Sequence, residues 1–104
     1  MKKNIKRALD KVPLITIAIS VDRNITYYNN FAKQKFLFIE EGRDINAVVR
    51  SMELNSFIDK AFREKIDFKV EFQPSNYEDW YFIADLVFFP ESEGSHKELI
   101  IILT

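Results

Sequence analysis

Residues 14–36 read LITIAISVDRNITYYNNFAKQKF, and this stretch decides the fold. Its first part, 14–21, is apolar, and its side chains alternate between two faces as in a β-strand. The triplet Asp-Arg-Asn at 22–24 predicts a tight turn, because Asp and Asn tolerate left-handed backbone and bond locally. Residues 25–28 then return as a second strand, so the stretch begins with a β-hairpin.

Three helices are predicted after the hairpin. Asn29 or Asn30 can cap the first with its side-chain oxygen, and this helix ends before Gly42. A second, short helix follows Asp44. The third, 53–65, is the clearest, because its apolar residues recur at i, i+3, i+4, i+7 and i+8. These residues are Leu54, Phe57, Ile58, Ala61 and Phe62.

The rest of the chain predicts three more strands and one more helix. Residues 66–73 alternate between apolar and polar, as expected of a strand with one wet face. Residues 78–89 and 97–104 predict two strands that are apolar on both faces. At the other end, helical spacing over residues 2–11 predicts a short amphipathic helix that Pro13 ends. Strands at both ends with helices between them favour an α+β fold, an antiparallel sheet with helices on one face.

Composition narrows the functional classes. The chain has 104 residues, 47% of them hydrophobic, which suits one domain with a packed core. Its net charge of -1 provides no basic field for nucleic acid. The absence of cysteine excludes disulfides, thiolate metal sites and cysteine nucleophiles. No apolar run approaches the roughly 20 residues of a membrane helix, so we expect a cytoplasmic domain that itself makes no membrane contact.

The order of elements and the first hairpin resemble a PAS domain from about residue 8 to residue 104. Many PAS domains have an acidic turn, then the pattern I-x-Y-x-N, then a helix with small and aromatic residues. The matching residues here are Asp22, Ile25, Tyr27 and Asn29, followed by Phe31, Ala32 and Phe36. The spacing of Arg50, Glu53 and Leu54 is similar to that in PAS domains of phosphate-regulon-type sensor histidine kinases. The usual turn glycine is replaced by Asn24, which can still adopt positive φ.

The resemblance implies both a fold and a role. The fold would be a PAS-like five-stranded antiparallel sheet, strand order 2-1-5-4-3, with helices on one face. Residues 1–13 would form an N-terminal helix and linker, and 14–104 the PAS domain. The role would be signal reception or transmission in a bacterial two-component sensor histidine kinase. The domain itself would not be an enzyme. The kinase part of the parent protein, a transferase, would carry the phosphoryl chemistry. That parent protein can be membrane-anchored.

Few residues suggest chemistry. His96 is the only histidine and stands in a polar loop, so we interpret it as an exposed loop residue and predict no metal site. Asp85 interrupts an apolar strand; it faces solvent or a partner, or it is a buried carboxylate tuned for sensing. No catalytic residue is predicted, because no acid–base pair or nucleophile constellation is visible.

The resemblance also indicates which cofactors to consider. Haem-binding relatives use a histidine on the long helix, and photoactive relatives form adducts through cysteine; residues 53–65 contain no histidine and the chain no cysteine. We therefore predict no cofactor. The alternative function is a PAS sensor of another signalling protein that binds a small apolar ligand or non-covalent flavin. The phenylalanines suit an apolar pocket, and they suit a filled core better.

Strands that are apolar on both faces predict an interface. Helices on one side of a sheet cannot bury both sets of side chains, and a large exposed apolar surface usually marks an interaction site. We therefore expect a homodimer, as well as contacts with the kinase and neighbouring domains of the parent protein. The interface residues predicted from the sequence are Ile5, Leu9, Leu14, Leu99 and Ile101.

Overall fold

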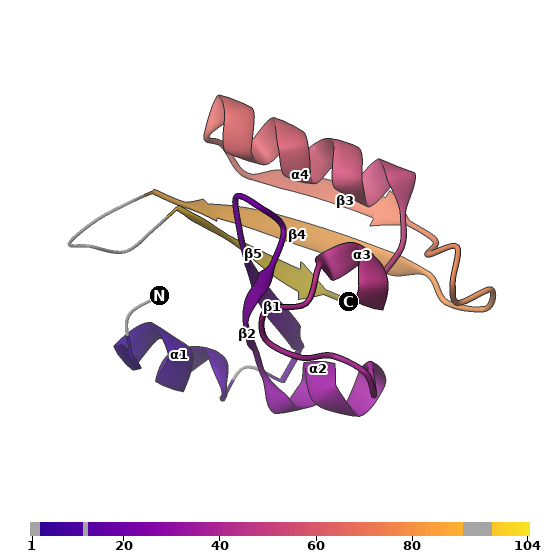
Figure 1. The fold of residues 1–104 in the computed structure, drawn as a ribbon, viewed down its shortest axis with the longest axis horizontal. Coiled ribbons are helices and arrows are strands. Elements are labelled where there is room, and N and C mark those ends of the chain that lie inside the picture. The colour runs from indigo at the N-terminus through magenta and orange to yellow at the C-terminus, as the bar shows by residue number, and fades with distance from the viewer. Residues whose placement is uncertain (1–2, 12, 91–96) are drawn as a thin grey trace.

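Five antiparallel strands form one sheet in the order β2-β1-β5-β4-β3 (Figure 1). This is a computed structural model, and it describes residues 3–11, 13–90 and 97–104. The strands are β1 (Ile15–Ser20), β2 (Ile25–Tyr28), β3 (Phe68–Phe72), β4 (Phe82–Phe89) and β5 (Glu98–Leu103). The sequence-based prediction of fold class and strand order is confirmed. The adjacent strands β1 and β5 come from opposite ends of the chain and pair along their whole length.

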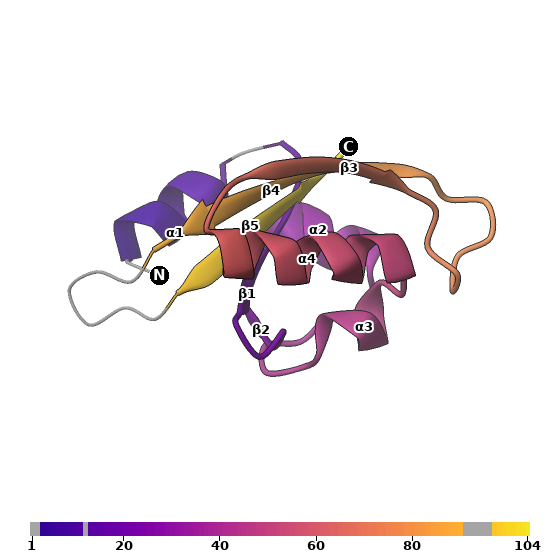
Figure 2. The same cartoon turned by 90° about the horizontal axis from the view of Figure 1, so that it is seen from above.

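Four helices accompany the sheet: α1 (Lys3–Leu9), α2 (Asn30–Lys35), α3 (Ile45–Val48) and α4 (Met52–Glu64). The last three begin at side-chain caps, where Asn29, Asp44 and Ser51 each accept a hydrogen bond from a backbone N–H of the first turn. The helices α2, α3 and α4 lie on one face of the sheet, called the inner face below (Figure 2). Helix α1 lies against the opposite, outer face.

The main core lies between the inner face and the three helices. Helix α4 contributes Leu54, Ile58 and Ala61, all at most 1% exposed, so its predicted apolar stripe faces the sheet. Phe57 is only partly buried and packs edge to face on Phe68, with ring centroids 5.5 Å apart. The helix phase predicted from the sequence is therefore right, although Phe57 lies at the margin of the core.

The strand predicted to begin at residue 78 begins at Phe82 instead. Residues 77–80 form a turn, in which the N–H of Trp80 donates to the carbonyl of Tyr77 over 3.2 Å. The two rings stack with centroids 3.9 Å apart, and both contact the buried ring of Phe36. Aromatic packing against α2 thus replaces strand pairing over this segment. Strand β3 also starts later than predicted, at Phe68, which leaves Ile66 exposed.

The hairpin turn differs from the prediction at one position. Arg23, and not Asn24, adopts positive φ, at 66°. Asn24 instead forms an isolated antiparallel bridge with Asp44, the cap of α3. The Arg23 side chain reaches α4 and pairs with Asp59. The hairpin tip is thereby connected to two of the inner-face helices.

Candidate functional site: the outer face of the sheet

A β-bulge in the first hairpin shapes the outer face. The register between β1 and β2 shifts after Ala18, which pairs with Tyr27, whereas Ile19 pairs with Ile25. Thr26 is the extra residue of the bulge. Its hydroxyl donates to the Glu98 carboxylate over 2.6 Å, and Tyr27 packs with Ala18 and Ile100. Two consecutive side chains of β2 therefore reach the outer face.

Tyr27 holds helix α1 on this face. Its hydroxyl donates to the carboxylate of Asp10 and lies 3.4 Å from the backbone oxygen of Lys6. Burial, followed by the hydrogen bond to Asp10 and the charge of that residue, raises the pKa of Tyr27 well above its usual value. The hydroxyl thus stays protonated and keeps its donor role. Leu9 of α1 packs beside it against Ala18 and Ile100.

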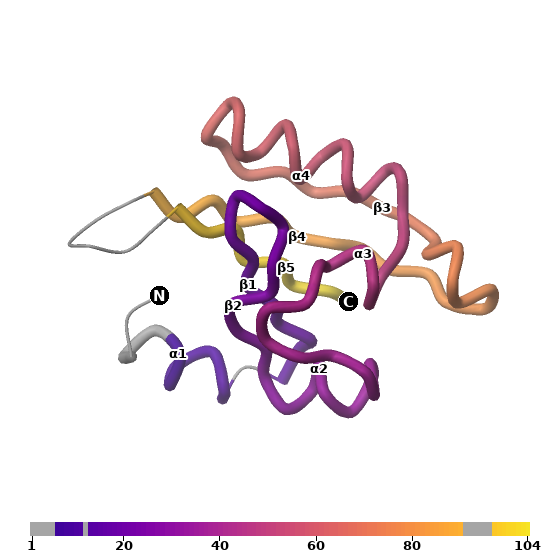
Figure 3. Tube along the Cα trace, in the orientation of Figure 1, coloured from indigo at the N-terminus to yellow at the C-terminus, as the bar shows by residue number. Residues whose placement is uncertain are grey.

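Asn29 secures the connection between α1 and β1. Its amide nitrogen donates to the carbonyl of Leu14 over 2.7 Å and lies 3.5 Å from that of Leu9. Its side-chain oxygen accepts from the N–H groups of Thr16 and Ala32. The side chain is 1% exposed, so these bonds are shielded from water. One buried amide therefore links the entry to β1 with the start of α2, and Figure 3 traces these segments passing side by side.

Beyond α1, the outer face carries a partly exposed apolar surface. Alternate residues of β4 and β5 point outward, and those with apolar side chains are Ile83, Val87, Phe89, Ile100 and Ile102. All except Ile100 are only partly buried. We call these residues, together with Leu9, the outer apolar surface. A carboxylate interrupts this surface: Asp85 lies between Ile83 and Val87 on β4 and pairs with Lys69 at 3.7 Å, and both of these charged side chains are well exposed.

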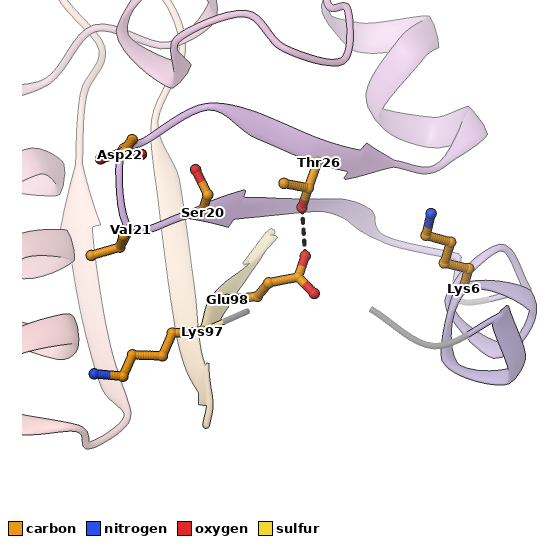
Figure 4. A pocket seen from close by; sticks show the side chains of 7 residues that line it. All are labelled: Lys6, Ser20, Val21, Asp22, Thr26, Lys97 and Glu98. Carbon is orange, nitrogen blue, oxygen red and sulfur yellow. Dashed lines mark hydrogen bonds between the residues drawn. The ribbon is translucent and has the colours of Figure 1, made fainter. Parts of the chain in front are cut away.

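A pocket of about 340 Å³ lies on the same face, between α1 and the ends of β1 and β5 (Figure 4). Apart from Val21, the side chains that line it are polar or charged: Lys6, Ser20, Asp22, Thr26, Lys97 and Glu98. Figure 4 shows the Thr26–Glu98 hydrogen bond across its middle and Lys6 extending from α1 toward it. The described residues that line the pocket offer hydroxyl, ammonium and carboxylate groups for polar contacts.

The structure separates the interface residues predicted from the sequence. Leu9 lies on the outer face, whereas Leu99 and Ile101 point inward and are at most 1% exposed within the main core. Their neighbours Ile100 and Ile102 occupy the outer face of β5 instead. Leu14 precedes β1 and is 38% exposed beside α2, in a hollow that Phe31 and Tyr81 also line. Ile5 lies in α1, but its side chain is outside the described part of the structure.

Two other candidates have simple outcomes. Asp85 has a side chain that is 43% exposed and pairs with a lysine, so its surroundings are those of a surface carboxylate. His96 lies outside the described residues. Within residues 3–11, 13–90 and 97–104, no cluster of histidine, cysteine, aspartate or glutamate could hold a metal ion. No helix in the same ranges has the length and apolarity needed to cross a membrane.

Aromatic rings fill much of the space beneath α2. Phe36 is fully buried, and its ring lies 5.8–6.0 Å from those of Tyr77, Trp80 and Phe82. Phe82 in turn contacts Phe72, which is also buried. Such offset and edge-to-face contacts are the usual packing of aromatic side chains in a protein core. The phenylalanines of this region thus pack on one another, as the filled-core interpretation expects.

Comparison with known proteins identifies the fold. No family model matches the sequence, and no curated protein shows significant similarity. Among solved structures, the PAS domain of histidine kinase ThkA is 23% identical and has a TM-score of 0.67, over 85% of this chain and 94% of that chain. The photoactive yellow protein domain of the sensor histidine kinase Ppr from Rhodospirillum centenum is 12% identical, with a TM-score of 0.71 over 100% and 99%.

A variant of RsLOV is similar in structure as well, with 13% identity and a TM-score of 0.76 over 100% of this chain and 69% of that chain. Sequence identities this low establish a shared fold and nothing finer. The chain therefore has the PAS fold. Its structural neighbours include PAS domains from sensor histidine kinases, whereas the phosphate-regulon-type resemblance of Arg50, Glu53 and Leu54 is not confirmed.

Proposed function

We propose that this domain is a regulatory PAS module of a bacterial two-component sensor histidine kinase and that it acts by association through its outer face. The outer apolar surface is the observation that carries the proposal. Several large side chains there remain partly exposed, and burying the exposed part of each contributes a fraction of the roughly 1.5–3 kcal/mol that full burial gives. The kinase origin of structural neighbours supports the assignment to this class of signalling protein.

The proposed association is a symmetric homodimer. Two-fold contacts are the commonest in homo-oligomers, and a flat sheet face is readily self-complementary. Helix α1 would be part of the interface, because Leu9 packs at the edge of the apolar surface. A signal would then change how α1 and the two sheets pack, with no chemistry in this domain. That change in packing would be transmitted to neighbouring domains of the parent protein. The domain would act in the cytoplasm.

Sedimentation velocity at micromolar concentrations tests the dimer. We expect a dimer for the wild type and a predominantly monomeric protein for Val87→Glu, because a second carboxylate beside Asp85 would lose its water and would lack the lysine partner that Asp85 has in Lys69. Leu9→Glu should weaken the dimer to a smaller extent. Met52→Glu is the matched control, since Met52 is 90% exposed on the helical side and should leave association unchanged. A wild-type monomer across this range would exclude the homodimer.

A further inference from the structure

Exposed apolar side chains gather around helix α2, on a part of the surface distinct from the outer face. Eight large apolar residues of the described chain are exposed: Leu14, Val21, Phe31, Leu37, Phe38, Met52, Ile66 and Tyr81. Five of them line two adjoining hollows beside α2. Leu37 and Phe38, which directly follow this helix, are 79% and 75% exposed. Scattered exposed apolar residues are ordinary in proteins, but a contiguous group usually marks a binding surface.

The two hollows share part of their lining along α2. The first, of about 530 Å³, is lined by Pro13, Leu14, Ile15, Phe31, Gln34, Lys35, Tyr81, Phe82, Leu103 and Thr104. The second, of about 280 Å³, is lined by Gln34, Lys35, Leu37, Phe38, Tyr77 and Trp80. Gln34 and Lys35 belong to both, and the rings of Phe82 and Trp80 meet between them with centroids 6.0 Å apart. We call this combined surface the α2 groove.

One cation lies at the centre of the groove. Lys35 has the only charged side chain among the described residues that line it. Its ammonium lies 3.9 Å from the centroid of the Trp80 ring, a cation–π contact that fixes its position. Among the described residues it has no carboxylate partner. Within the described part of the chain, the groove therefore combines aromatic walls with a single positive charge that has no carboxylate partner.

These features specify the partner. We propose that the α2 groove binds an amphipathic segment of another protein, with one carboxylate between apolar side chains. Leu37 and Phe38 would contact the apolar side chains, and Lys35 would pair with the carboxylate.

Selection from a displayed library of random short peptides tests the proposal. The wild-type domain is the bait, and the double variant Leu37→Ser/Phe38→Ser removes peptides that bind elsewhere. We expect enrichment of peptides with Asp or Glu beside aromatic or aliphatic residues. Trp80 is the only tryptophan and lines the groove, so its fluorescence reports binding of each enriched peptide directly. Circular dichroism shows whether each variant is folded, and exposed residues such as Leu37 and Phe38 should be replaceable without unfolding.

The variant Lys35→Met separates this proposal from its rivals. This substitution should lower the affinity for the enriched peptides by about tenfold. Met52 is an exposed apolar residue outside the groove, so Met52→Ser should leave that affinity unchanged. Equal binding to Lys35→Met, or enrichment without acidic residues, would overturn the charge recognition. Failure to enrich any peptide over the double variant would overturn the docking site. If the wild type bound phosphatidylglycerol vesicles and Leu37→Ser/Phe38→Ser did not, the groove would be reassigned to a membrane. If the double variant lost self-association instead, the groove would be reassigned to a second copy of this chain.

Discussion

Replacement of Asn29 tests how the fold holds its N-terminal segment. In Asn29→Ala, helix α2 loses its cap, the bond that Ala32 N–H donates over 3.0 Å, which costs about 0.5–2 kcal/mol. The buried N–H of Thr16 loses its side-chain acceptor, which costs about a further 1–3 kcal/mol. The carbonyl of Leu14 keeps one partner, because the Thr16 hydroxyl also donates to it over 3.1 Å. We therefore expect a total loss of about 1.5–5 kcal/mol.

Such a loss is large for a domain of this size, whose free energy of unfolding is about 5–10 kcal/mol. Urea unfolding followed by Trp80 fluorescence should show the midpoint of Asn29→Ala lowered by about 1–3 M. Asn29→Ser keeps a capping hydroxyl but cannot reach all three partners, so its urea midpoint should lie between those of the wild type and Asn29→Ala. The matched control is Asn30→Ala, because Asn30 is the next residue, of the same type, and exposed. Similar losses from Asn29→Ala and Asn30→Ala would refute the reasoning.

Three further predictions concern the core, helix α1 and the aromatic cluster. Ile58→Ala should cost about 2–5 kcal/mol in urea unfolding because Ile58 is fully buried, whereas Asp59→Ala should cost less than about 1 kcal/mol, since its ion pair with Arg23 is largely exposed. Tyr27→Phe should lower the free energy of unfolding below pH 10, and the difference from the wild type should shrink at higher pH. The pKa of Tyr27 is raised in the folded protein, so this residue stabilises the fold at pH values below its unfolded pKa near 10. That contribution is lost as the pH rises toward the folded pKa. Because Phe36, Trp80 and Phe82 pack on one another, the purified protein should show no visible absorption band, and a flavin-like spectrum would support the ligand-binding alternative.

The fold could be predicted from the sequence because its signals are local. The apolar period on α4 is that of a helix, and its buried side chains are those that the period indicated. Asn29 and Asp44 act as the helix caps that their residue types suggested. The limits of the strand predicted at 78–89 were less accurate, because β-propensity does not reveal that Tyr77 and Trp80 stack on each other and against α2.

The site could be predicted only in part. Alternation in β5 indicates two apolar faces, but nothing local to the strand determines which face the helices cover. Leu99 and Ile101 were therefore assigned to the interface, although Ile100 and Ile102 are the residues that point outward. The groove around α2 was missed for a similar reason. It joins Leu14, Phe38 and Trp80 from three separate segments, and a helical or strand period carries no signal for such a meeting.

The I-x-Y-x-N pattern that suggested the fold also explains how α1 is attached. Regular alternation would place Ile25 and Tyr27 on the same face of β2, and the bulge at Thr26 separates them. Ile25 then joins the main core, while Tyr27 and Asn29 bind α1 and the segment after it. A single short strand thus connects the inner core, the outer face and the start of α2. A change in the packing of α1 would therefore act directly on the hydrogen bonds of Tyr27 and Asn29, and through Asn29 on α2.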